Sequence, residues 1–289
     1  MRDSEIANPL NAKFGDYLSK INQTLQKELE LYSWSEFYSP LKYACDNGKR
    51  IRPLILVLSA EIINSKKNPY SLVDDNVFTA ASAIELLHTE SVIHDDIIDE
   101  ERIRRGRPSF HVKYGYNNSI LTADFVLGII LHLSSKLNNP KVSTELANAA
   151  IKMSDGEMME IKLTENNKIT ENDYIKVLEN KTGSLFEASA RIGAILGGGD
   201  EHDIQSLGNF GSMMGISYQI RDDLIDWHNE DRLFNLLMRQ NKETDSLVER
   251  MEKIYRSYYS KAKNELESVT VNSTSKHIDD LANLTTICF

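Results

Sequence analysis

Two short aspartate clusters, each at the end of an apolar stretch, constrain this chain more than any other feature. The first is DDIID at residues 95–99 and the second is DDLID at residues 222–226, so both have the form DDxxD. On a helix, positions i and i+4 lie on the same face, so the first and last aspartates of each cluster lie side by side. Carboxylates this close repel one another unless a cation relieves the repulsion. The chain must therefore fold so that a cation can reach the end of each helix.

These clusters predict two metal-binding faces. A single acidic run is more often a solvated helix end, but here the pattern occurs twice, each time after apolar stretches such as residues 80–87 and 213–220. Ligand sets made only of oxygen favour hard cations, and Mg²⁺ is often held by a few carboxylates together with substrate phosphates. We therefore expect two helix faces that hold a diphosphate between them through metal ions. The predicted metal ligands are Asp95, Asp96, Asp99, Asp222, Asp223 and Asp226.

The distribution of prolines and apolar residues predicts an all-α fold. The chain has six prolines and none follows Pro140, so half of the sequence is free of helix breakers. Strand patterns are scarce, whereas apolar residues recur at steps of three and four, as at Leu247, Met251 and Ile254. With no linker evident, we predict one domain over residues 1–289. Helices are expected at residues 11–38, 50–65, 74–100, 119–137, 140–164, 171–180, 183–197, 203–228 and 243–269, with loops at 66–73, 104–118 and 165–170.

The composition narrows the class of protein. A formal net charge of −10 argues against a nucleic-acid binder, because no basic surplus is left to neutralise phosphates. The 41% hydrophobic content is sufficient for a large core. Cys45 and Cys288 are too few for a disulfide framework, and the N-terminus lacks the apolar segment of a signal peptide. We expect a cytoplasmic protein without a transmembrane segment, since no apolar run approaches the roughly 18 residues of a membrane span.

Three basic segments predict a second phosphate site. Residues 48–53 (GKRIRP) open an apolar helix, where Lys49 and Arg52 share one face and the helix N-terminus adds positive potential. Residues 102–108 (RIRRGRP) follow the first acidic cluster, and arginine forks match phosphate oxygens. Residues 181–183 (KTG) precede another helix. Each segment also has a plainer interpretation, since basic runs are usually solvated surface.

Single residues in these segments have plainer interpretations as well. Arg104 and Arg105 could simply neutralise the acidic residues that precede them. A lone histidine among apolar residues, such as His88, is more often a hydrogen-bonded core residue. Gln219 could be a satisfied buried amide. It is the combination of these residues with the two acidic clusters that favours a functional site.

Together the segments resemble the trans-isoprenyl diphosphate synthases, the short- to medium-chain polyprenyl synthetases. The resemblance runs from about residue 48 to residue 226, in the family's order and approximate spacing, and is carried by GKRIRP, HTESVIHDDIIDEERIRRGRP, KTG and YQIRDDLID. It implies an all-α bundle around a central cavity, with the two acidic motifs facing each other across its mouth, and usually a homodimer. It also implies a Mg²⁺-dependent prenyltransferase that adds isopentenyl diphosphate head-to-tail to an allylic diphosphate.

The resemblance also implies roles for individual residues. The six aspartates would hold two or three Mg²⁺ ions on the allylic diphosphate, which Arg104 and Lys181 would contact directly. Thr182 and Gln219 would lie along the allylic C1–O bond, where positive charge develops. The site for isopentenyl diphosphate would comprise Lys49, Arg52, His88 and Arg105.

These residue types suit that chemistry. Breaking the allylic C–O bond creates a carbocation and a departing diphosphate, and Mg²⁺ with fixed cations stabilises the leaving group. Hydroxyl and carbonyl dipoles can stabilise the carbocation. In the family's mechanism the released diphosphate accepts the proton, so no separate protein base is needed. Water must be excluded, because it would convert the carbocation into an alcohol.

The chain departs from the family pattern after the second acidic motif. Most members carry a flexible loop with glycines and lysines there, whereas here no lysine occurs between Asp226 and Lys242. This difference implies a slower enzyme, a different lid, or replacement of the lysines by Arg232 or Arg239. It is also compatible with a subunit that works only with a partner.

Product length depends, in the family, on the residues four and five positions before the first aspartate. These are Ser91 and Glu90 here. The small Ser91 leaves room in a product tunnel, which favours a C20 (geranylgeranyl) product and leaves C15, C25 and longer products open. An ionised Glu90 in an apolar tunnel would be costly, so it is protonated, paired with a cation or turned away from the tunnel.

Two other functions stay open at this point. The first is a subunit of a heteromeric prenyl synthase with little activity alone, which the divergent C-terminal part favours and the two complete DDxxD motifs oppose. The second is a class I terpene cyclase, which shares the helical fold and the metal-triggered ionisation. A cyclase needs no isopentenyl diphosphate site, so Lys49, Arg52 and Arg105 argue against it.

Overall fold

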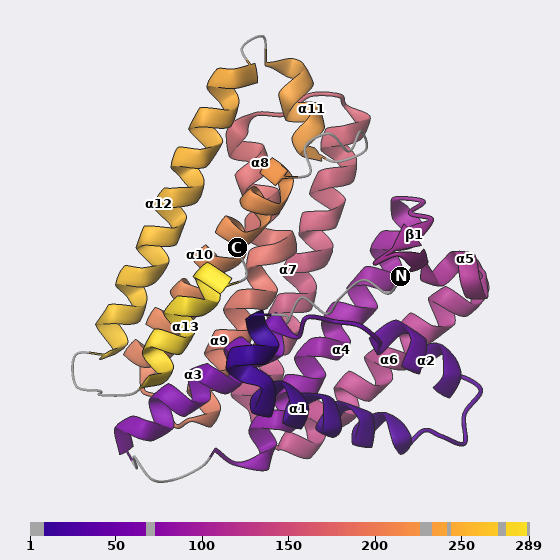
Figure 1. Cartoon of the computed structure of the whole chain (residues 1–289). Coiled ribbons are helices and arrows are strands. Elements are labelled where there is room, and N and C mark those ends of the chain that lie inside the picture. Colours follow the sequence, from indigo (N-terminus) through magenta and orange to yellow (C-terminus); the bar gives the residue numbers. More distant parts are fainter. Residues whose placement is uncertain (1–8, 68–72, 226–232, 242–243, 271–275, 288–289) are drawn as a thin grey trace, which may run out of the picture. The chain divides into compact units, whose positions relative to one another are not determined.

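The computed structural model describes residues 9–67, 73–225, 233–241, 244–270 and 276–287 (Figure 1). Helices make up nearly all of the regular structure in these residues, and the strands among them form a single two-stranded hairpin. The prediction of an all-α fold is therefore confirmed.

Packing divides the chain into two compact units. The first comprises Met1–Val57 and Asp74–Pro140, and the second comprises Leu58–Val73 and Lys141–Phe289. Helix α3 (Ile51–Lys67) begins in the first unit and ends in the second. The predictions of one domain and of a central cavity stay predictions.

The first unit is built around helix α4 (Asp75–Ile98). Every residue of α4 from Val77 to Leu87 is buried, so this stretch is covered on all sides, as core helices are. Its N-terminus is capped by Asp74, whose side chain accepts a hydrogen bond from the backbone N–H of Asn76 at 2.8 Å. Helix α4 packs against α6 and α1. The other elements of the unit are α1 (Pro9–Glu30), α2 (Tyr38–Cys45), β1 (Ile103–Arg104), β2 (Arg107–Pro108), α5 (Phe110–Tyr114) and α6 (Tyr116–Leu137).

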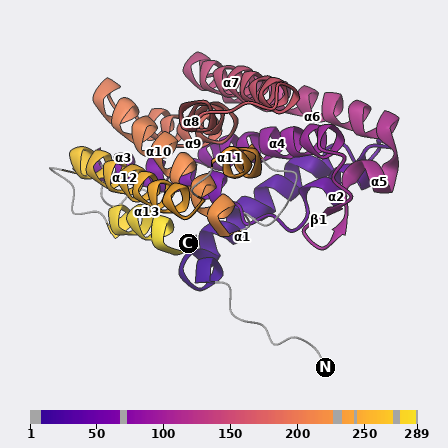
Figure 2. The same ribbon diagram turned by 90° about the horizontal axis from the view of Figure 1, so that it is seen from above.

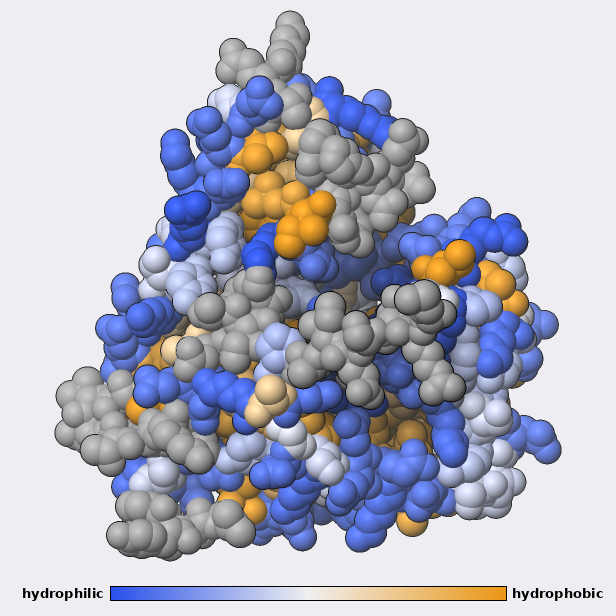
Figure 3. All heavy atoms as spheres, in the orientation of Figure 1, coloured by the Kyte–Doolittle hydropathy of each residue, from blue (hydrophilic) through white to orange (hydrophobic). Residues whose placement is uncertain are grey.

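The second unit is built around helix α10 (Glu201–Ile225), which packs against α9 and α12. Helix α13 lies against α12 in both ribbon views (Figures 1 and 2). Figure 3 shows hydrophilic side chains along the outer edge of α12 and an apolar patch on its inner side, as expected for an amphipathic helix. The remaining elements are α7 (Pro140–Glu165), α8 (Glu171–Leu178), the π-helical turn η1 (Glu179–Gly183), α9 (Ser184–Leu196), α11 (Leu233–Gln240), α12 (Thr244–Thr270) and α13 (Lys276–Ile287).

Glycines allow α9 and α10 to approach closely. A Cβ atom added at Gly211 would lie 2.5 Å from the carbonyl oxygen of Phe186, and one added at Gly215 would lie 3.0 Å from the Cα atom of Gly183. Real side chains do not fit at such distances. The two helices therefore approach closely next to Gly183, the last residue of the KTG segment.

Several predicted boundaries are wrong. The helix expected at residues 11–38 ends at Glu30, because the chain turns there and the aromatic rings of Tyr32 and Phe37 pack on Phe125, with centroids 5.5 and 4.7 Å away. Helix α2 begins only at Tyr38 and was not predicted. The loop expected at residues 104–118 contains the hairpin, α5 and the start of α6. Helices α11 and α13 were not predicted.

Helix α6 is long and apolar enough to cross a membrane by length and composition alone. Its most apolar window has a mean hydropathy of 1.6, and 39% of that window is buried. Core helices of soluble proteins meet the same criterion, so this is weak evidence of a membrane span. The prediction that no apolar run approaches spanning length is wrong for α6, whereas the predicted lack of a transmembrane segment stays a prediction.

Candidate active site

The first acidic motif lies at the C-terminal end of α4, and its aspartates differ in exposure. Asp99 is exposed and Asp95 is half-buried, whereas Asp96 is only 2% exposed. Two nitrogens of the Arg104 guanidinium face Oδ1 of Asp96: Nε donates to it at 2.7 Å, and Nη2 lies 2.5 Å from it. Burial raises the pKa of Asp96, against the opposing effect of Arg104. The motif thus combines one anchored carboxylate with two that reach the surface.

The basic segment after this motif forms a tight hairpin rather than a loop. Its two central residues, Arg105 and Gly106, have φ values of 53° and 72°, as the favoured two-residue hairpin turn requires. The hairpin is tied to the end of α2: Arg105 donates to the carbonyl of Asn47 at 3.2 Å, and Arg107 donates to the carbonyl of Tyr43 at 2.6 Å. The arginines are therefore held in place by contacts distant in sequence.

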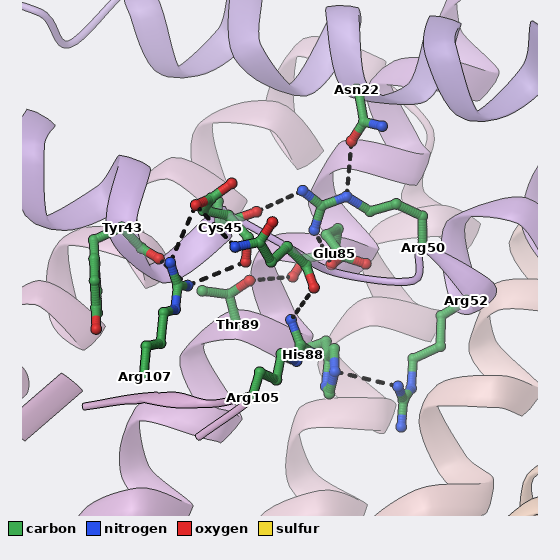
Figure 4. Close-up of polar contacts among 12 residues, drawn as sticks. Asn22, Tyr43, Cys45, Arg50, Arg52, Glu85, His88, Thr89, Arg105 and Arg107 are labelled. Carbon is green, nitrogen blue, oxygen red and sulfur yellow. Dashed lines mark hydrogen bonds and ion pairs between the residues drawn. The ribbon is translucent and has the colours of Figure 1, made fainter. Parts of the chain in front are cut away.

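In the GKRIRP segment, Arg50 anchors the chain, whereas its neighbours Lys49 and Arg52 are the predicted phosphate ligands (Figure 4). Arg50, with a left-handed φ of 56°, is buried and donates to Asn22 at 2.9 Å and to the carbonyl of Cys45 at 2.5 Å. Its Nη1 atom lies 2.5 Å from a carboxylate oxygen of Glu85. One guanidinium thus joins α1, α2 and α4. Lys49, by contrast, is exposed.

Gly48 is required by this anchor. A Cβ atom at position 48 would lie 2.3 Å from Nη1 of Arg50 and 2.9 Å from the carboxylate of Glu85. Any larger residue would displace the guanidinium. The glycine of the motif therefore makes room for Arg50, and the left-handed backbone at Arg50 turns the chain into α3.

Arg52 and His88, both predicted for the second phosphate site, are in contact. Nη1 of Arg52 lies 3.3 Å from Nε2 of His88 (Figure 4). Burial, and then the charges of Arg52 and Arg105, lower the pKa of His88 well below its usual 6.5. Neutral His88 accepts the hydrogen bond from Arg52 on Nε2, which leaves its Nδ1 as the protonated ring nitrogen.

The second acidic motif lies at the C-terminal end of α10 and repeats the same division. Asp222 is half-buried, whereas Asp223 is 5% exposed. Asp223 accepts hydrogen bonds on both oxygens, from the amide of Gln219 at 3.0 Å and from the hydroxyl of Tyr174 at 2.6 Å. Asp226 lies outside the described residues, as does Arg232.

The KTG segment lies on the π-helical turn between α8 and α9. Single π turns inside helices are rare and often occur at functional sites. Lys181 on this turn lies 2.5 Å from Glu157 and 2.8 Å from Glu160, both on α7, and Thr182 donates to the carbonyl oxygen of Gln219 at 3.4 Å. The structure therefore brings Thr182, Gln219 and Asp223 together, and their roles in a shared site stay predictions.

The two residues predicted to set product length are engaged within α4. The hydroxyl of Ser91 donates to the carbonyl of His88 at 2.9 Å, and a carboxylate oxygen of Glu90 lies 3.2 Å from Nδ1 of His94. The hydrogen bond with Glu90 raises the pKa of His94. Of the three alternatives for Glu90, pairing with a cation has support here.

Four residues that contact the predicted site were missed: Arg50, Glu85, Arg107 and Tyr174. The contacts between Arg50 and Glu85, Tyr174 and Asp223, and Arg107 and Tyr43 join residues 35 to 64 positions apart in sequence, so no local spacing indicates them. The GKR triplet was the available signal for Arg50. Tyr174 lies in an ordinary apolar pattern, which carries no signal at all.

Two other features of the described residues lie apart from this site. An open pocket of about 870 Å³ between α1, α2 and α5 is lined by Arg50 but by none of the predicted substrate ligands. A group formed by Asp200, His202 and Asp203 has the spacing of a metal site. Asp203, however, forms an ion pair with Lys66 at 2.6 Å. The side chain of Asp200 accepts a hydrogen bond from the backbone N–H of Asp203 at 2.9 Å, so Asp200 caps the N-terminus of α10.

The all-α fold and the paired DDxxD motifs define an isoprenoid-synthase type of protein. A family model for polyprenyl synthetase matches residues 35–270, and the chain belongs to this family. The resemblance inferred from the motifs is therefore confirmed at the level of the family.

Curated relatives include synthases of different products. A geranylgeranyl diphosphate synthase of Methanosarcina mazei is 33% identical over 214 residues, which cover 72% of this chain and 64% of that protein. An octaprenyl diphosphate synthase of Escherichia coli is 30% identical over 208 residues, 72% of this chain and 61% of that protein. The matched part of the chain thus spans less than two thirds of either relative.

Solved structures resemble the chain over nearly its full length. A geranylgeranyl pyrophosphate synthetase from the archaeon Geoglobus acetivorans superimposes with a TM-score of 0.80 at 27% identity, covering 93% of this chain and 98% of that one. A geranyltranstransferase from Thermotoga maritima gives a TM-score of 0.77 at 25% identity, covering 94% and 98%.

Proposed function

We propose that this protein is a Mg²⁺-dependent prenyltransferase that condenses isopentenyl diphosphate head-to-tail with an allylic diphosphate. One observation carries the proposal: within the first unit, Arg104 binds Asp96 of the first acidic motif, and Arg105 follows it in the same hairpin, while Asp95 and Asp99 keep exposed surface. A site for a metal-bound diphosphate needs carboxylates that bind the metal ion and arginines that bind the phosphate oxygens. Membership of the polyprenyl synthetase family supports the same activity.

The residues present fit the metal. Asp95, Asp99 and Asp222 are hard oxygen donors with part of their surface exposed, and we propose that they, with Asp226, hold two or three Mg²⁺ ions. Asp96 and Asp223 were also predicted as ligands. Their protein hydrogen bonds give them a further role, which is to hold each motif in place. Bound Mg²⁺ would stabilise the negative charge of the departing diphosphate.

The basic residues divide between two substrates. Arg104 and Lys181 would contact the allylic diphosphate, and Lys181 would exchange its contacts with Glu157 and Glu160 for the phosphate oxygens. Lys49, Arg52, His88 and Arg105 would hold isopentenyl diphosphate. Neutral His88 suits this role, because its Nδ1–H can donate a hydrogen bond while Nε2 keeps Arg52 oriented.

The chemical step needs stabilisation of a carbocation. We place the allylic carbon next to Thr182 and Gln219, whose hydroxyl and carbonyl dipoles would face the developing positive charge. The double bond of isopentenyl diphosphate then attacks that carbon. The released diphosphate accepts the proton that the isopentenyl unit loses after the new C–C bond has formed. Excluding water from this step prevents hydrolysis to the alcohol.

For the product we propose a C20 (geranylgeranyl) diphosphate, with C15, C25 and longer products as alternatives. Ser91 is small and carries its hydrogen bond within α4, so it leaves room for a growing chain. The relatives make products of several lengths, among them geranylgeranyl and octaprenyl diphosphates, so they support the reaction class rather than one product.

Two alternatives make different predictions. A class I terpene cyclase would consume an allylic diphosphate without isopentenyl diphosphate. A subunit of a heteromeric synthase would show little activity alone, which the divergent C-terminal part, with no lysine between Asp226 and Lys242, favours. Arg239, one proposed replacement for those lysines, is exposed on α11.

A product assay tests the proposal. The purified chain would receive isopentenyl diphosphate, Mg²⁺ and, separately, dimethylallyl, geranyl or farnesyl diphosphate, with product length read by mass spectrometry. Elongation that stops at one length supports the synthase and identifies its product. Consumption of the allylic substrate alone supports the cyclase. A folded chain that does neither supports the partner-dependent subunit.

We further propose that the chain forms a homodimer in the cytoplasm, binds no nucleic acid and is not inserted into a membrane. Helix α6 exposes several apolar side chains that a second copy could cover: Ile120, Leu121, Leu127 and Leu131. Light scattering after size exclusion measures the mass. A monomer at micromolar concentration would contradict the dimer.

A further inference from the structure

Tyr174 on α8 is a fully buried side chain whose hydroxyl reaches the second acidic motif. It donates a hydrogen bond at 2.6 Å to Oδ2 of Asp223, which is itself buried. The ring packs against Phe234 with a centroid separation of 5.5 Å. The hydroxyl and the ring therefore make different contacts, and a substitution can remove the first while keeping the second.

The other oxygen of Asp223 orients Gln219. The side-chain amide of Gln219 donates from Nε2 to Oδ1 of Asp223 at 3.0 Å. A carboxylate can only accept, so the amide must present its nitrogen to Asp223 and its carbonyl oxygen away from it. That oxygen accepts the hydrogen bond from Thr182. The direction of the Gln219 carbonyl dipole is thus set by Asp223.

We propose that Tyr174 is a positioning residue for the transfer reaction. Through Asp223, it holds the amide of Gln219 with its carbonyl oxygen toward Thr182, where the proposed carbocation forms. This inference rests on the proposed function and adds a residue to it. All four residues belong to the second unit.

The physical reason lies in preorganisation. A dipole that already points at the place where charge develops stabilises the transition state without having to reorient. When the hydroxyl of Tyr174 is removed, Oδ2 of Asp223 loses a buried hydrogen bond, so the carboxylate holds the amide of Gln219 less firmly. Because positive charge on the allylic carbon is absent from the bound substrate and develops only as the C–O bond breaks, the loss appears in kcat rather than in substrate binding.

The primary test is Tyr174→Phe in the full-length chain, assayed with isopentenyl diphosphate, Mg²⁺ and the best allylic primer. We expect kcat to fall about tenfold, the effect of losing one hydrogen bond to a charged group. Both KM values should stay within about twofold of the wild type. An unchanged kcat overturns the inference, and so does a loss confined to KM.

Two controls separate positioning from folding. Phe234→Leu loosens the same packing and keeps the hydroxyl, so it should lower the unfolding temperature while kcat, measured well below that temperature, stays near the wild type. Tyr258→Phe removes a hydroxyl from a partly buried tyrosine that packs on the same apolar cluster, and kcat should not change. If Phe234→Leu lowers kcat as much as Tyr174→Phe does, the role of Tyr174 is structural and the inference is overturned.

A double-mutant cycle shows whether Tyr174 acts through Gln219. In a Gln219→Met background no amide is left to position, so adding Tyr174→Phe should lower kcat by less than about twofold further. Multiplication of the two single effects contradicts the inference. Failure of the proposed function is distinguished at the outset, because the wild-type chain would then not elongate any primer.

Discussion

The guanidinium of Arg50 and the carboxylate of Glu85 form a buried ion pair at 2.5 Å, between residues less than 10% exposed. The same guanidinium also binds Asn22 and the carbonyl of Cys45, so the start of α3 is joined to three other helices (Figure 4). On either side of Arg50, Lys49 and Arg52 are the residues predicted to bind phosphate. The ion pair therefore sets the position of this part of the site.

Breaking this pair should be strongly destabilising. Glu85→Ala leaves the charge of Arg50 buried without its carboxylate, which costs about 3–5 kcal/mol of the free energy of unfolding. Urea denaturation of the two proteins measures the difference. The matched control is Glu171→Ala, which breaks the partly exposed pair with Arg250 at 2.8 Å and should cost less than about 1 kcal/mol. Equal losses of unfolding free energy in both variants would contradict the prediction that the buried pair contributes more to stability than the partly exposed one.

The lowered pKa of His88 should make stability fall in acid. The unfolded chain takes up a proton near the usual pKa of 6.5, whereas folded His88 stays neutral to lower pH. Its contribution is therefore complete above the unfolded pKa and is lost as the pH falls below it. Denaturation midpoints of the wild type and of His88→Gln, compared at pH 7.5 and pH 5, isolate this effect. The wild type should lose more stability than the variant over this interval.

His94, on the same helix, should behave in the opposite way. Its pKa is raised by the hydrogen bond with Glu90, so the pair is strongest when His94 is protonated. The contribution is complete below the unfolded pKa and is lost as the pH rises through the folded pKa. An NMR titration of the histidine ring protons should give a pKa above the usual value for His94, and Glu90→Gln should lower it. An identical pKa in the variant would contradict the pairing.

Enlarging Ser91 should shorten the product. A phenylalanine at this position would fill space that the proposed growing chain occupies, so Ser91→Phe should shift the products by at least one five-carbon unit toward shorter chains. Mass spectrometry of the products measures the change. Ser154→Phe, at an exposed position on α7, is the control and should leave the chain length as it is in the wild type.

The two proposed substrates should separate in the kinetics of single variants. Arg105→Met removes a residue proposed to bind the phosphates of isopentenyl diphosphate. The KM for isopentenyl diphosphate should therefore rise at least about tenfold, since a charge-assisted contact is lost. Lys181→Met should instead raise the KM for the allylic substrate. Lys141→Ala, which breaks an exposed pair with Glu201, is the control and should change neither KM. A rise of the allylic KM in Arg105→Met would contradict the division.

Those features of the protein that depend on near neighbours were predictable from the sequence. Helical period, the scarcity of prolines and the i, i+4 spacing of the aspartates are local properties, and they predicted the all-α fold and the helix-borne acidic motifs correctly. The GKRIRP and KTG segments likewise indicated where to look for the cationic residues. The boundaries that failed, such as the helix expected at residues 11–38, failed where aromatic packing on Phe125 outweighs local preference.

Tertiary structure alone decided how chemically identical residues differ. Asp95 and Asp96 are adjacent and have the same side chain, yet Asp96 is buried against Arg104 while Asp95 keeps part of its surface. Asp222 and Asp223 are divided in the same way by Tyr174, which is 49 residues away. The physical reason is that burial and hydrogen bonding depend on which distant side chains fill the space around a group. The sequence determined which helices carry the carboxylates, and packing determined which of those carboxylates serve as anchors and which are left at the surface.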